Sequence, residues 1–181
     1  MTIMTTSITK AAQEMGLEPV AMKRLRNGMD ARTAVQALLD SNLPGAALRL
    51  QMRLLPRGYV VPWICQCAAE APLDDDDRDG LRLAETWVRE RDEANRRAAL
   101  AHAAQHHYVG AGALIAASAG WSEGFLLDAA GKEVAPVAAH LMAVVAAGAL
   151  LTLAASGKDF DTCCRSYVTR ALDLLRSEDT V

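Results

Sequence analysis

Long runs of alanine and other small apolar residues constrain the fold of this protein more than any other feature. Three of them read A-A-L-A-H-A-A (98–104), A-L-I-A-A-S-A (113–119) and A-V-V-A-A-G-A-L-L (143–151), and runs of β-branched residues are scarce. Alanine has the highest intrinsic helix propensity, and its small side chain allows helices to approach closely. Aromatic residues make up only 4% of the sequence, so small aliphatic side chains must fill most of the core. The sequence therefore predicts an all-α fold of closely packed helices.

The predicted architecture is a single compact bundle of about seven helices, with an alanine-rich hydrophobic helix at its centre. A length of 181 residues suits one domain. A protein of this size buries roughly 70% of its extended surface on folding, which is enough for a core without disulfides or a metal. The apolar pattern is weak in residues 1–28, which we interpret as an N-terminal segment and a short helical appendage. The bundle domain is then residues 29–181.

Capping residues and prolines predict several helix boundaries. Asp30 and Asp92 each precede a helical pattern and are expected to act as N-caps. The four aspartates at 74–77 are typical of a helix N-terminus, where acidic side chains complement the helix dipole. Pro62 is tolerated only in the first turn of a helix, so we expect its helix to begin near residues 59–61.

The most apolar segments lie in the second half of the sequence. Residues 108–121 predict a buried helix, residues 122–132 a polar loop, and residues 160–175 an amphipathic last helix. Residues 134–155 are the most hydrophobic stretch and have the length of a membrane span. A proline, a histidine and the lack of a basic flank weaken that interpretation, so we place this helix at the centre of the bundle and expect no membrane contact.

A helix-turn-helix-like pattern in residues 8–27 is the main signal for nucleic-acid binding. Ala12, Gly16 and Met22 have the spacing of such a motif, which would present a recognition helix to DNA. The net charge of −3 opposes this, because proteins that bind nucleic acid through their whole surface are usually basic. We consider nucleic acid an unlikely partner and favour a short amphipathic helix with a solvated basic face. The basic residues concerned are Lys23, Arg24 and Arg26.

His102 and His106 are spaced so that both imidazoles lie on one face of a helix. Zinc proteases use the same spacing, but there a glutamate follows the first histidine and activates water, whereas alanine follows His102. His107 points about 100° away on a helix of 3.6 residues per turn, so it adds no third ligand. We therefore predict no metal and interpret the histidines as the C-terminal turn of a helix that ends before Gly110.

The cysteines are predicted to be reduced thiols. Cys65 and Cys67 are too close for ordinary bridging on a helix, and Cys163 and Cys164 are adjacent. Reduced thiols are typical of the cytoplasm. The sequence begins M-T-I-M-T-T-S-I-T-K, which lacks the apolar segment of a signal peptide. We therefore expect a cytoplasmic protein.

The sequence has no recognisable catalytic motif, which predicts that the protein is not an enzyme. It has no nucleophile elbow and no phosphate-binding loop, and its G-A-G at 110–112 lacks the spacing of a dinucleotide fingerprint, so we expect no cofactor. We predict a protein-interaction module. One or two of its large rings are candidates to anchor a partner, and the alternative, which we favour, is that all of these rings fill the core. The loop at 122–132 is a further contact candidate. The candidate rings are Trp63, Trp87, Trp121, Phe125 and Tyr59.

Several segments resemble an uncharacterised bacterial family of all-helical domains. In that family a segment of the type L-P-x-R-x-A-V-x-W-x-C-x-C-A is followed by a helix ending near W-V, a W-S-x-G loop and an alanine-rich helix. The resemblance spans roughly residues 30–175. The matching pieces here are Leu55-Pro56, Trp63, Cys65, Cys67, Trp87-Val88, Trp121-Ser122-Glu123-Gly124 and residues 144–155.

This resemblance implies a role rather than an activity. Some members of the family belong with secretion loci, including those of type VI secretion. The resemblance therefore implies a cytosolic adaptor or chaperone-like accessory protein whose partner is a secretion component or effector. Three alternatives stay open, namely an immunity protein that neutralises a toxin, a DNA-binding regulator, and a metal or haem protein. A closely packed alanine-rich bundle is also compatible with a homodimer.

Overall fold

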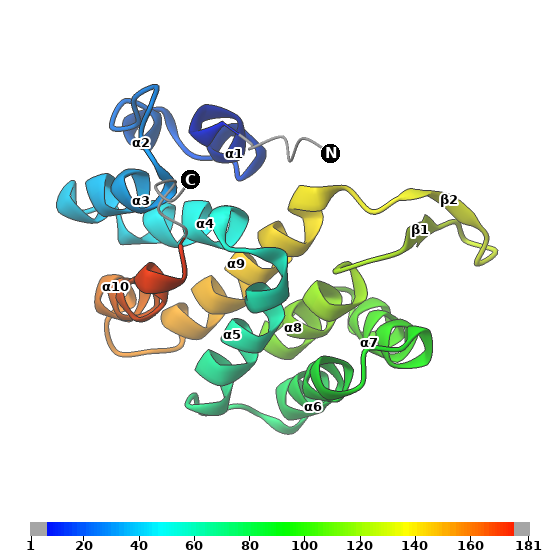
Figure 1. Ribbon diagram of the computed structural model, residues 1–181. Coiled ribbons are helices and arrows are strands. Elements are labelled where there is room, and N and C mark those ends of the chain that lie inside the picture. Colours follow the sequence, from blue (N-terminus) through cyan, green and yellow to red (C-terminus); the bar gives the residue numbers. More distant parts are fainter. Residues whose placement is uncertain (1–6, 176–181) are drawn as a thin grey trace.

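The computed structural model describes residues 7–175 and confirms the all-α class (Figure 1). This part of the protein contains ten α-helices, one short 3-10 helix and one two-stranded sheet. The count exceeds the predicted seven or so partly because the N-terminal segment itself forms two short helices. The elements are α1 (Ile8–Glu14), α2 (Pro19–Met22), α3 (Ala31–Asp40), α4 (Pro44–Leu54), α5 (Arg57–Ala69), α6 (Asp75–Arg89), α7 (Glu93–Gln105), α8 (Ala111–Gly120), β1 (Phe125–Leu127), β2 (Glu133–Pro136), α9 (Ala139–Ala155), α10 (Phe160–Ala171) and η1 (Leu172–Leu174).

Aspartate N-caps set the beginnings of four helices. The side chains of Asp30, Asp74, Asp92 and Asp159 each accept a hydrogen bond from the backbone amide three residues later, at 2.7 or 2.8 Å. Each bond satisfies an amide that has no partner within the helix. The predicted starts at Asp30 and Asp92 are therefore confirmed, as is the capping role of the aspartate run at 74–77.

The alanine-rich helices α8 and α9 occupy the interior (Figure 1). Every residue of α8 is buried except Leu114, which is half-buried. This helix packs against α6, α7 and α9, while α9 also contacts α4, α5 and α10. The predicted central helix is therefore confirmed for residues 139–155, and the predicted buried helix for residues 111–120.

Glycines bring α6 and α8 into backbone contact. A Cβ atom at Gly80 would overlap the Gly112 carbonyl, and a Cβ atom at Gly112 would overlap the backbone of Asp77. The Asp77 carboxylate accepts a hydrogen bond from the Gly112 amide at 2.6 Å, which joins the two helices at the same point. The two backbones therefore touch where any larger residue would hold them apart.

The segment from Ser122 to Pro136 differs from the prediction. The expected loop contains β1, and the first residues of the expected helix form β2, which pairs antiparallel with β1. Asp128 shapes the turn, since its side chain accepts from the amides of Ala130 and Lys132 at 2.9 Å. Pro136 cannot donate a helical hydrogen bond. Residues 133–136 pair with β1 instead, and α9 begins only at Ala139.

The helix α5 begins earlier than predicted. Its first residue is Arg57, directly after Pro56, so Pro62 lies inside the helix rather than in its first turn. Proline has no N–H to offer the carbonyl four residues earlier, here that of Gly58. Burial of the apolar residues around Pro62 offsets this cost, because Val60 and its neighbours pack into the core. Propensity is thus overridden by tertiary packing.

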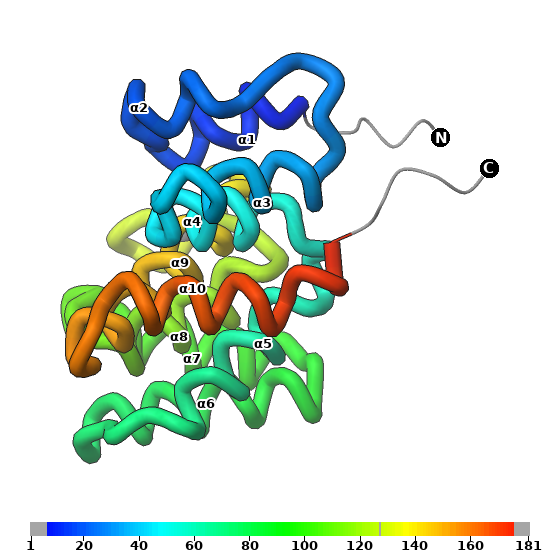
Figure 2. Tube along the Cα trace, turned by 90° about the vertical axis from the view of Figure 1, so that its left-hand side faces the viewer, coloured from blue at the N-terminus to red at the C-terminus, as the bar shows by residue number. Residues whose placement is uncertain are grey.

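The N-terminal segment packs on the bundle. Ala11, Ala12 and Met15 are buried and belong to the common hydrophobic core. The helix α1 contacts α4, and Glu14 pairs with Arg53 at 2.7 Å. Figure 2 shows α1 and α2 stacked over α3 and α4, with α6 at the opposite end of the molecule. Residues 1–6 and 176–181 lie outside the described residues.

The last helix is confirmed, although its end differs slightly. The helix α10 ends at Ala171 and continues as η1. Cys164 and Val168 are fully buried, as the amphipathic pattern predicts, whereas Phe160 is exposed at the start of the helix. None of the helices in the described part of the protein has the length and hydropathy of a membrane span.

Candidate interaction site

The site is built around the turn that joins α8 to the β1–β2 hairpin. This turn has the sequence W-S-E-G, from Trp121 to Gly124. The Ser122 hydroxyl donates to the Ala119 carbonyl at 2.6 Å, which ties the turn to the end of α8. The Val137 amide donates to the Gly124 carbonyl at 3.0 Å and closes the hairpin. The hairpin therefore leaves the bundle from a fixed base.

Two arginines from distant helices hold backbone carbonyls at this base. Arg57, the first residue of α5, donates to the Ser122 carbonyl at 2.6 Å. Arg96 of α7 donates to the Gly120 carbonyl, also at 2.6 Å. Hydrogen bonds from a charged donor are stronger than those between neutral groups. The base of the hairpin is therefore attached to α5 and α7 as well as to α8.

Arg96 is the more deeply placed of the two, with 4% of its surface exposed. Its charge is balanced by Glu93, whose two carboxylate oxygens each accept from Arg96 at 2.7 Å. Hydrogen bonds from Arg96 and Arg97 lower the pKa of Glu93 to about 2, so this carboxylate is ionised at neutral pH. Gly124 leaves room for the guanidinium, because a Cβ atom there would lie 2.8 Å from Arg96 Cζ.

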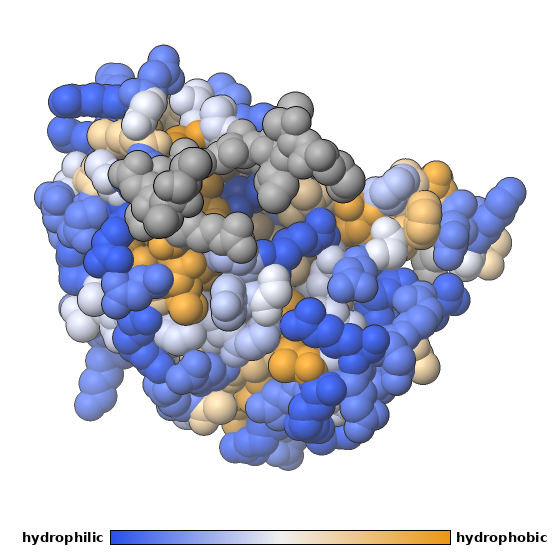
Figure 3. Space-filling model, viewed as in Figure 1, coloured by the Kyte–Doolittle hydropathy of each residue, from blue (hydrophilic) through white to orange (hydrophobic). Residues whose placement is uncertain are grey.

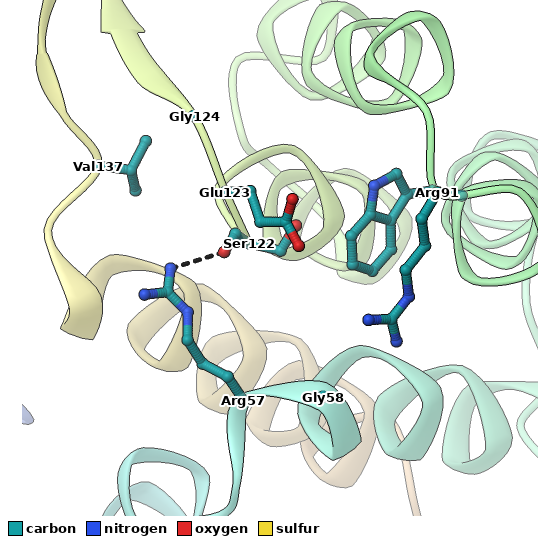
Figure 4. Close-up of a pocket in the computed structure, with 8 residues that line it drawn as sticks. Arg57, Gly58, Arg91, Ser122, Glu123, Gly124 and Val137 are labelled. Atoms are coloured by element: carbon teal, nitrogen blue, oxygen red, sulfur yellow. Dashed lines mark hydrogen bonds between the residues drawn. The ribbon is translucent and has the colours of Figure 1, made fainter. Parts of the chain in front are cut away.

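A pocket of about 310 Å³ opens beside the base of the hairpin. Its walls come from the first turn of α5, the end of α6, the linker to α7, the W-S-E-G turn and the segment after β2. Figure 4 shows Arg57 and Arg91 on opposite sides of Glu123. The lining residues are Arg57, Gly58, Trp87, Arg91, Ser122, Glu123, Gly124 and Val137.

The pocket carries two guanidinium groups and one carboxylate. Arg91 Cζ lies 5.0 Å from the centre of the Trp87 ring. This cation–π contact uses no hydrogen-bond donor, and Arg91 is exposed, so its N–H groups stay accessible to a ligand. Within residues 7–175, neither Arg57 nor Arg91 has a carboxylate oxygen within 4.0 Å. The exposed Glu123 offsets only one of the two positive charges, so the pocket is suited to a small anionic group.

The five rings predicted as partner contacts divide into a buried and an accessible group. Trp63 and Trp87 are 6% and 4% exposed, because their large apolar surface is needed in a core otherwise poor in aromatic residues. Tyr59 and Phe125 are 53% and 42% exposed. Trp121 is half-buried and stacks on a neighbouring tyrosine. Partner contact therefore stays a prediction for Tyr59, Phe125 and Trp121, while the structure gives Trp63 and Trp87 core positions.

The hairpin presents apolar side chains to solvent. Phe125 of β1 is exposed, and Val134 of β2 is 67% exposed. Figure 1 shows the hairpin projecting from one side of the bundle, and Figure 3 shows apolar surface along it among hydrophilic residues. Sequence reasoning missed Val134 because it placed residues 134–155 in one helix. It also missed the roles of Arg57, Arg91 and Arg96, since no local pattern tells an arginine that binds a distant carbonyl from one on a solvated face.

Comparison with protein families gives one match. The model of a family of unknown function, DUF6931, matches residues 34–175, which is more than half of the sequence. The chain belongs to this family. The DUF6931 match includes the hairpin and every residue that lines the pocket, and it begins inside α3, after α1 and α2. The match confirms the coarser prediction that the chain belongs to a family of unknown function. No curated protein and no solved structure shows significant similarity to this sequence.

His102 and His106 lie at the end of α7, as predicted. His106 is the C-cap residue, and the ring centres of His102 and His106 are 4.3 Å apart. Burial, together with the neighbouring His106, lowers the pKa of His102 below its ordinary value, which favours a neutral ring. In the part of the protein that the structure describes, no three His, Cys, Asp or Glu side chains are grouped as metal ligands would be.

The four cysteines are free thiols in this structure. Burial raises the pKa of Cys65 and Cys67 to about 12 and that of Cys164 to about 11. Thiols with such pKa values are protonated at neutral pH and react poorly as nucleophiles. Cys65, Cys67 and Cys164 lie in the core as small apolar groups, as predicted, whereas Cys163 is only partly buried against it.

Proposed function

We propose that this DUF6931 protein is a non-enzymatic interaction module that holds a protein partner on the β1–β2 hairpin and the adjoining pocket. The observation that carries the proposal is the combination of exposure and anchoring. Phe125 and Val134 are exposed on a hairpin whose base is attached to Arg57 and Arg96. A pre-organised surface loses less conformational entropy on binding than a mobile one. A large exposed ring is also a typical anchor of a protein interface.

The polar groups of the pocket support binding rather than catalysis. The Ser122 hydroxyl donates to the Ala119 carbonyl, so its proton is directed toward a backbone acceptor and not toward a general base. The buried thiols have raised pKa values. The guanidiniums of Arg57 and Arg91 supply only hydrogen-bond donors, which suit the recognition of anions. These are the properties of a recognition site.

The resemblance to proteins of secretion loci suggests the class of partner. We propose a bacterial cytoplasmic adaptor or chaperone-like accessory that binds a component or effector of a secretion system, such as type VI secretion. An immunity protein would use the same surface to hold a toxin. Mass spectrometry of the bound partner separates the two roles, because an adaptor retains secretion components and an immunity protein retains one toxin.

DNA binding has less structural support. The second helix of the helix-turn-helix-like segment, α2, contains only four residues, from Pro19 to Met22. A recognition helix places several residues in the major groove, which a single turn does not provide. The net charge of −3 also opposes binding to a polyanion.

The proposal predicts that partner capture depends on the hairpin. Replacing Phe125→Ala together with Val134→Ser removes its exposed apolar anchors, and we expect the amount of captured partner to fall at least about tenfold, as for interface hot spots. The measurement is affinity capture from the source bacterium followed by quantitative mass spectrometry.

A matched control lies on another face of the molecule. Phe160, the other phenylalanine of the sequence, is 41% exposed, and Val20 is 47% exposed; both line a separate pocket of about 250 Å³. Phe160→Ala with Val20→Ser is expected to capture as much partner as the wild type. If this control loses the partner while the hairpin variant retains it, the interaction surface lies at α2 and α10, and the proposal is wrong.

A further inference from the structure

We infer that the pocket at the base of the hairpin binds a carboxylate group of the partner polypeptide, held between Arg57 and Arg91. This inference rests on the proposed interaction function and adds the chemistry that the partner must present. The carboxylate belongs either to an acidic side chain or to the C-terminus of the partner, which share the planar, singly charged group that guanidinium recognises.

The geometry of the two arginines carries the inference. Arg57 uses one N–H on the Ser122 carbonyl at 2.6 Å, which fixes its guanidinium at the pocket wall (Figure 4). Arg91 lies on the other side, where it makes a cation–π contact with the Trp87 ring. Both cations are thus positioned before a ligand arrives, and neither is within 4.0 Å of a carboxylate in residues 7–175.

The surroundings of the pocket strengthen its preference for an anion. Gly58 lines the pocket from the first turn of α5, where helix amides lack partners within the helix and the dipole is positive. The ring of Trp87 provides an apolar wall. A volume of about 310 Å³ accommodates one side chain or one polypeptide end. The pocket therefore suits a single acidic residue rather than an extended ligand.

A peptide carboxylate fits the site better than the phosphate of a nucleic acid. The pocket contains Glu123, and the hairpin beside it carries Asp128 and Glu133. These acidic side chains repel a polyanion, whose binding normally requires an extended basic surface. Phe125 and Val134 provide apolar contacts for the rest of a polypeptide. Glu123 also opposes a single carboxylate, but its one negative charge faces the two positive charges of Arg57 and Arg91.

The test uses short peptides and the purified full-length protein. The probes are acetyl-Ala-Phe-Glu-amide, whose carboxylate is on a side chain, and acetyl-Ala-Phe with a free C-terminus. The neutral reference is acetyl-Ala-Phe-Gln-amide. Binding is followed by NMR through the signals of Gly58, Gly124 and the Trp87 indole. We expect at least one acidic probe to bind about tenfold more tightly than the reference, the effect of one good charge-assisted contact. The acidic probe that binds more tightly shows whether the pocket prefers a side-chain carboxylate or a C-terminal carboxylate.

Variants make the assignment specific. Arg91→Gln should reduce the ratio of acidic to neutral affinity to about one, because a neutral amide cannot form the charge-assisted bond. Arg89→Gln is the matched control, since Arg89 is an exposed arginine that does not line the pocket, and the ratio should stay unchanged. Glu123→Gln should raise the affinity for acidic probes several-fold, because it removes the opposing charge.

Three outcomes would overturn the inference. The first is equal affinity for acidic and neutral probes, and the second is a preference that survives Arg91→Gln. The third is that inorganic phosphate or a DNA oligonucleotide shifts the same NMR signals and binds more tightly than the acidic peptides. The pocket would then be a phosphate site. Because these assays use purified protein, they can fail while hairpin-dependent capture succeeds. Conversely, if the hairpin variant captures as much partner as the wild type, the proposed function is wrong, while the result of the peptide assay still stands.

Discussion

Gly112→Ala is expected to destabilise the protein by about 3 kcal/mol, at the upper end of the usual cost of overpacking a core. The added methyl group would overlap the backbone of Asp77, and a backbone, unlike a side chain, cannot rotate away. The helices α6 and α8 must therefore separate, which stretches the 2.6 Å hydrogen bond from the Gly112 amide to Asp77. Chemical denaturation in urea measures the change. In a domain of this size the melting temperature should fall by roughly 6–12 °C.

Gly58→Ala is the control for this substitution. Gly58 also lies in a helix, but nothing stands within 4 Å of a Cβ atom built there. Alanine reduces the conformational entropy of the unfolded state, so we expect a gain of about 0.4–1 kcal/mol. Equal effects of Gly58→Ala and Gly112→Ala would show that α6 and α8 are not in backbone contact.

Arg96→Met is expected to lower the free energy of unfolding by about 2 kcal/mol, the usual cost of leaving a buried polar group without its partner. The Gly120 carbonyl loses a charged donor at 2.6 Å, although the methionine still fills most of the volume. The damage should concentrate at the base of the hairpin, because Gly124 packs against the guanidinium. Urea denaturation measures the free energy of unfolding. Hydrogen exchange of the Val137 amide, which donates to the Gly124 carbonyl, measures how well the base of the hairpin is held.

Arg97→Met is the control. It removes one positive charge, as Arg96→Met does, but leaves the hydrogen bond from Arg96 to the Gly120 carbonyl in place. Arg97 binds the same carboxylate, that of Glu93, at 2.6 Å, and it also lies 3.9 Å from the carboxylate of Glu133 in β2. The side chains of Arg97 and Glu133 are 51% and 55% exposed, so both of these ion pairs are open to solvent. An exposed ion pair contributes little, so we expect a change below about 0.5 kcal/mol and an unaltered hairpin. If Arg97→Met and Arg96→Met prove equally costly, the buried bond to the Gly120 carbonyl does not hold the hairpin.

Much of the fold follows from local signals in the sequence. The N-caps Asp30 and Asp92 and the alanine-rich runs predicted the correct helices because capping and propensity depend on neighbouring residues. The helix α5 begins earlier than predicted, since burial of its apolar face outweighs the cost of Pro62. The hairpin was missed because an apolar stretch such as 134–155 does not by itself distinguish a strand from a helix. Only Pro136 marked the boundary.

The candidate site was much less predictable than the fold. Trp121 and Phe125 were identified as candidate contacts because large rings are rare in this protein. The pocket, however, joins α5, the linker after α6 and the W-S-E-G turn, which are separated by more than thirty positions along the sequence. Arg57 lies 65 positions from the carbonyl it binds. Contacts of this kind depend on the tertiary arrangement of helices, which periodicity does not encode.

The central claim is that the hairpin and the pocket at its base form the partner surface. Hydrogen–deuterium exchange of the purified protein, alone and with its captured partner, tests this claim most directly. Our account predicts slower exchange at residues 122–137 and at the first turn of α5 in the complex, with unchanged exchange in α2 and α10. Protection confined to α2 and α10, with the hairpin exchanging as fast as in the free protein, would contradict it.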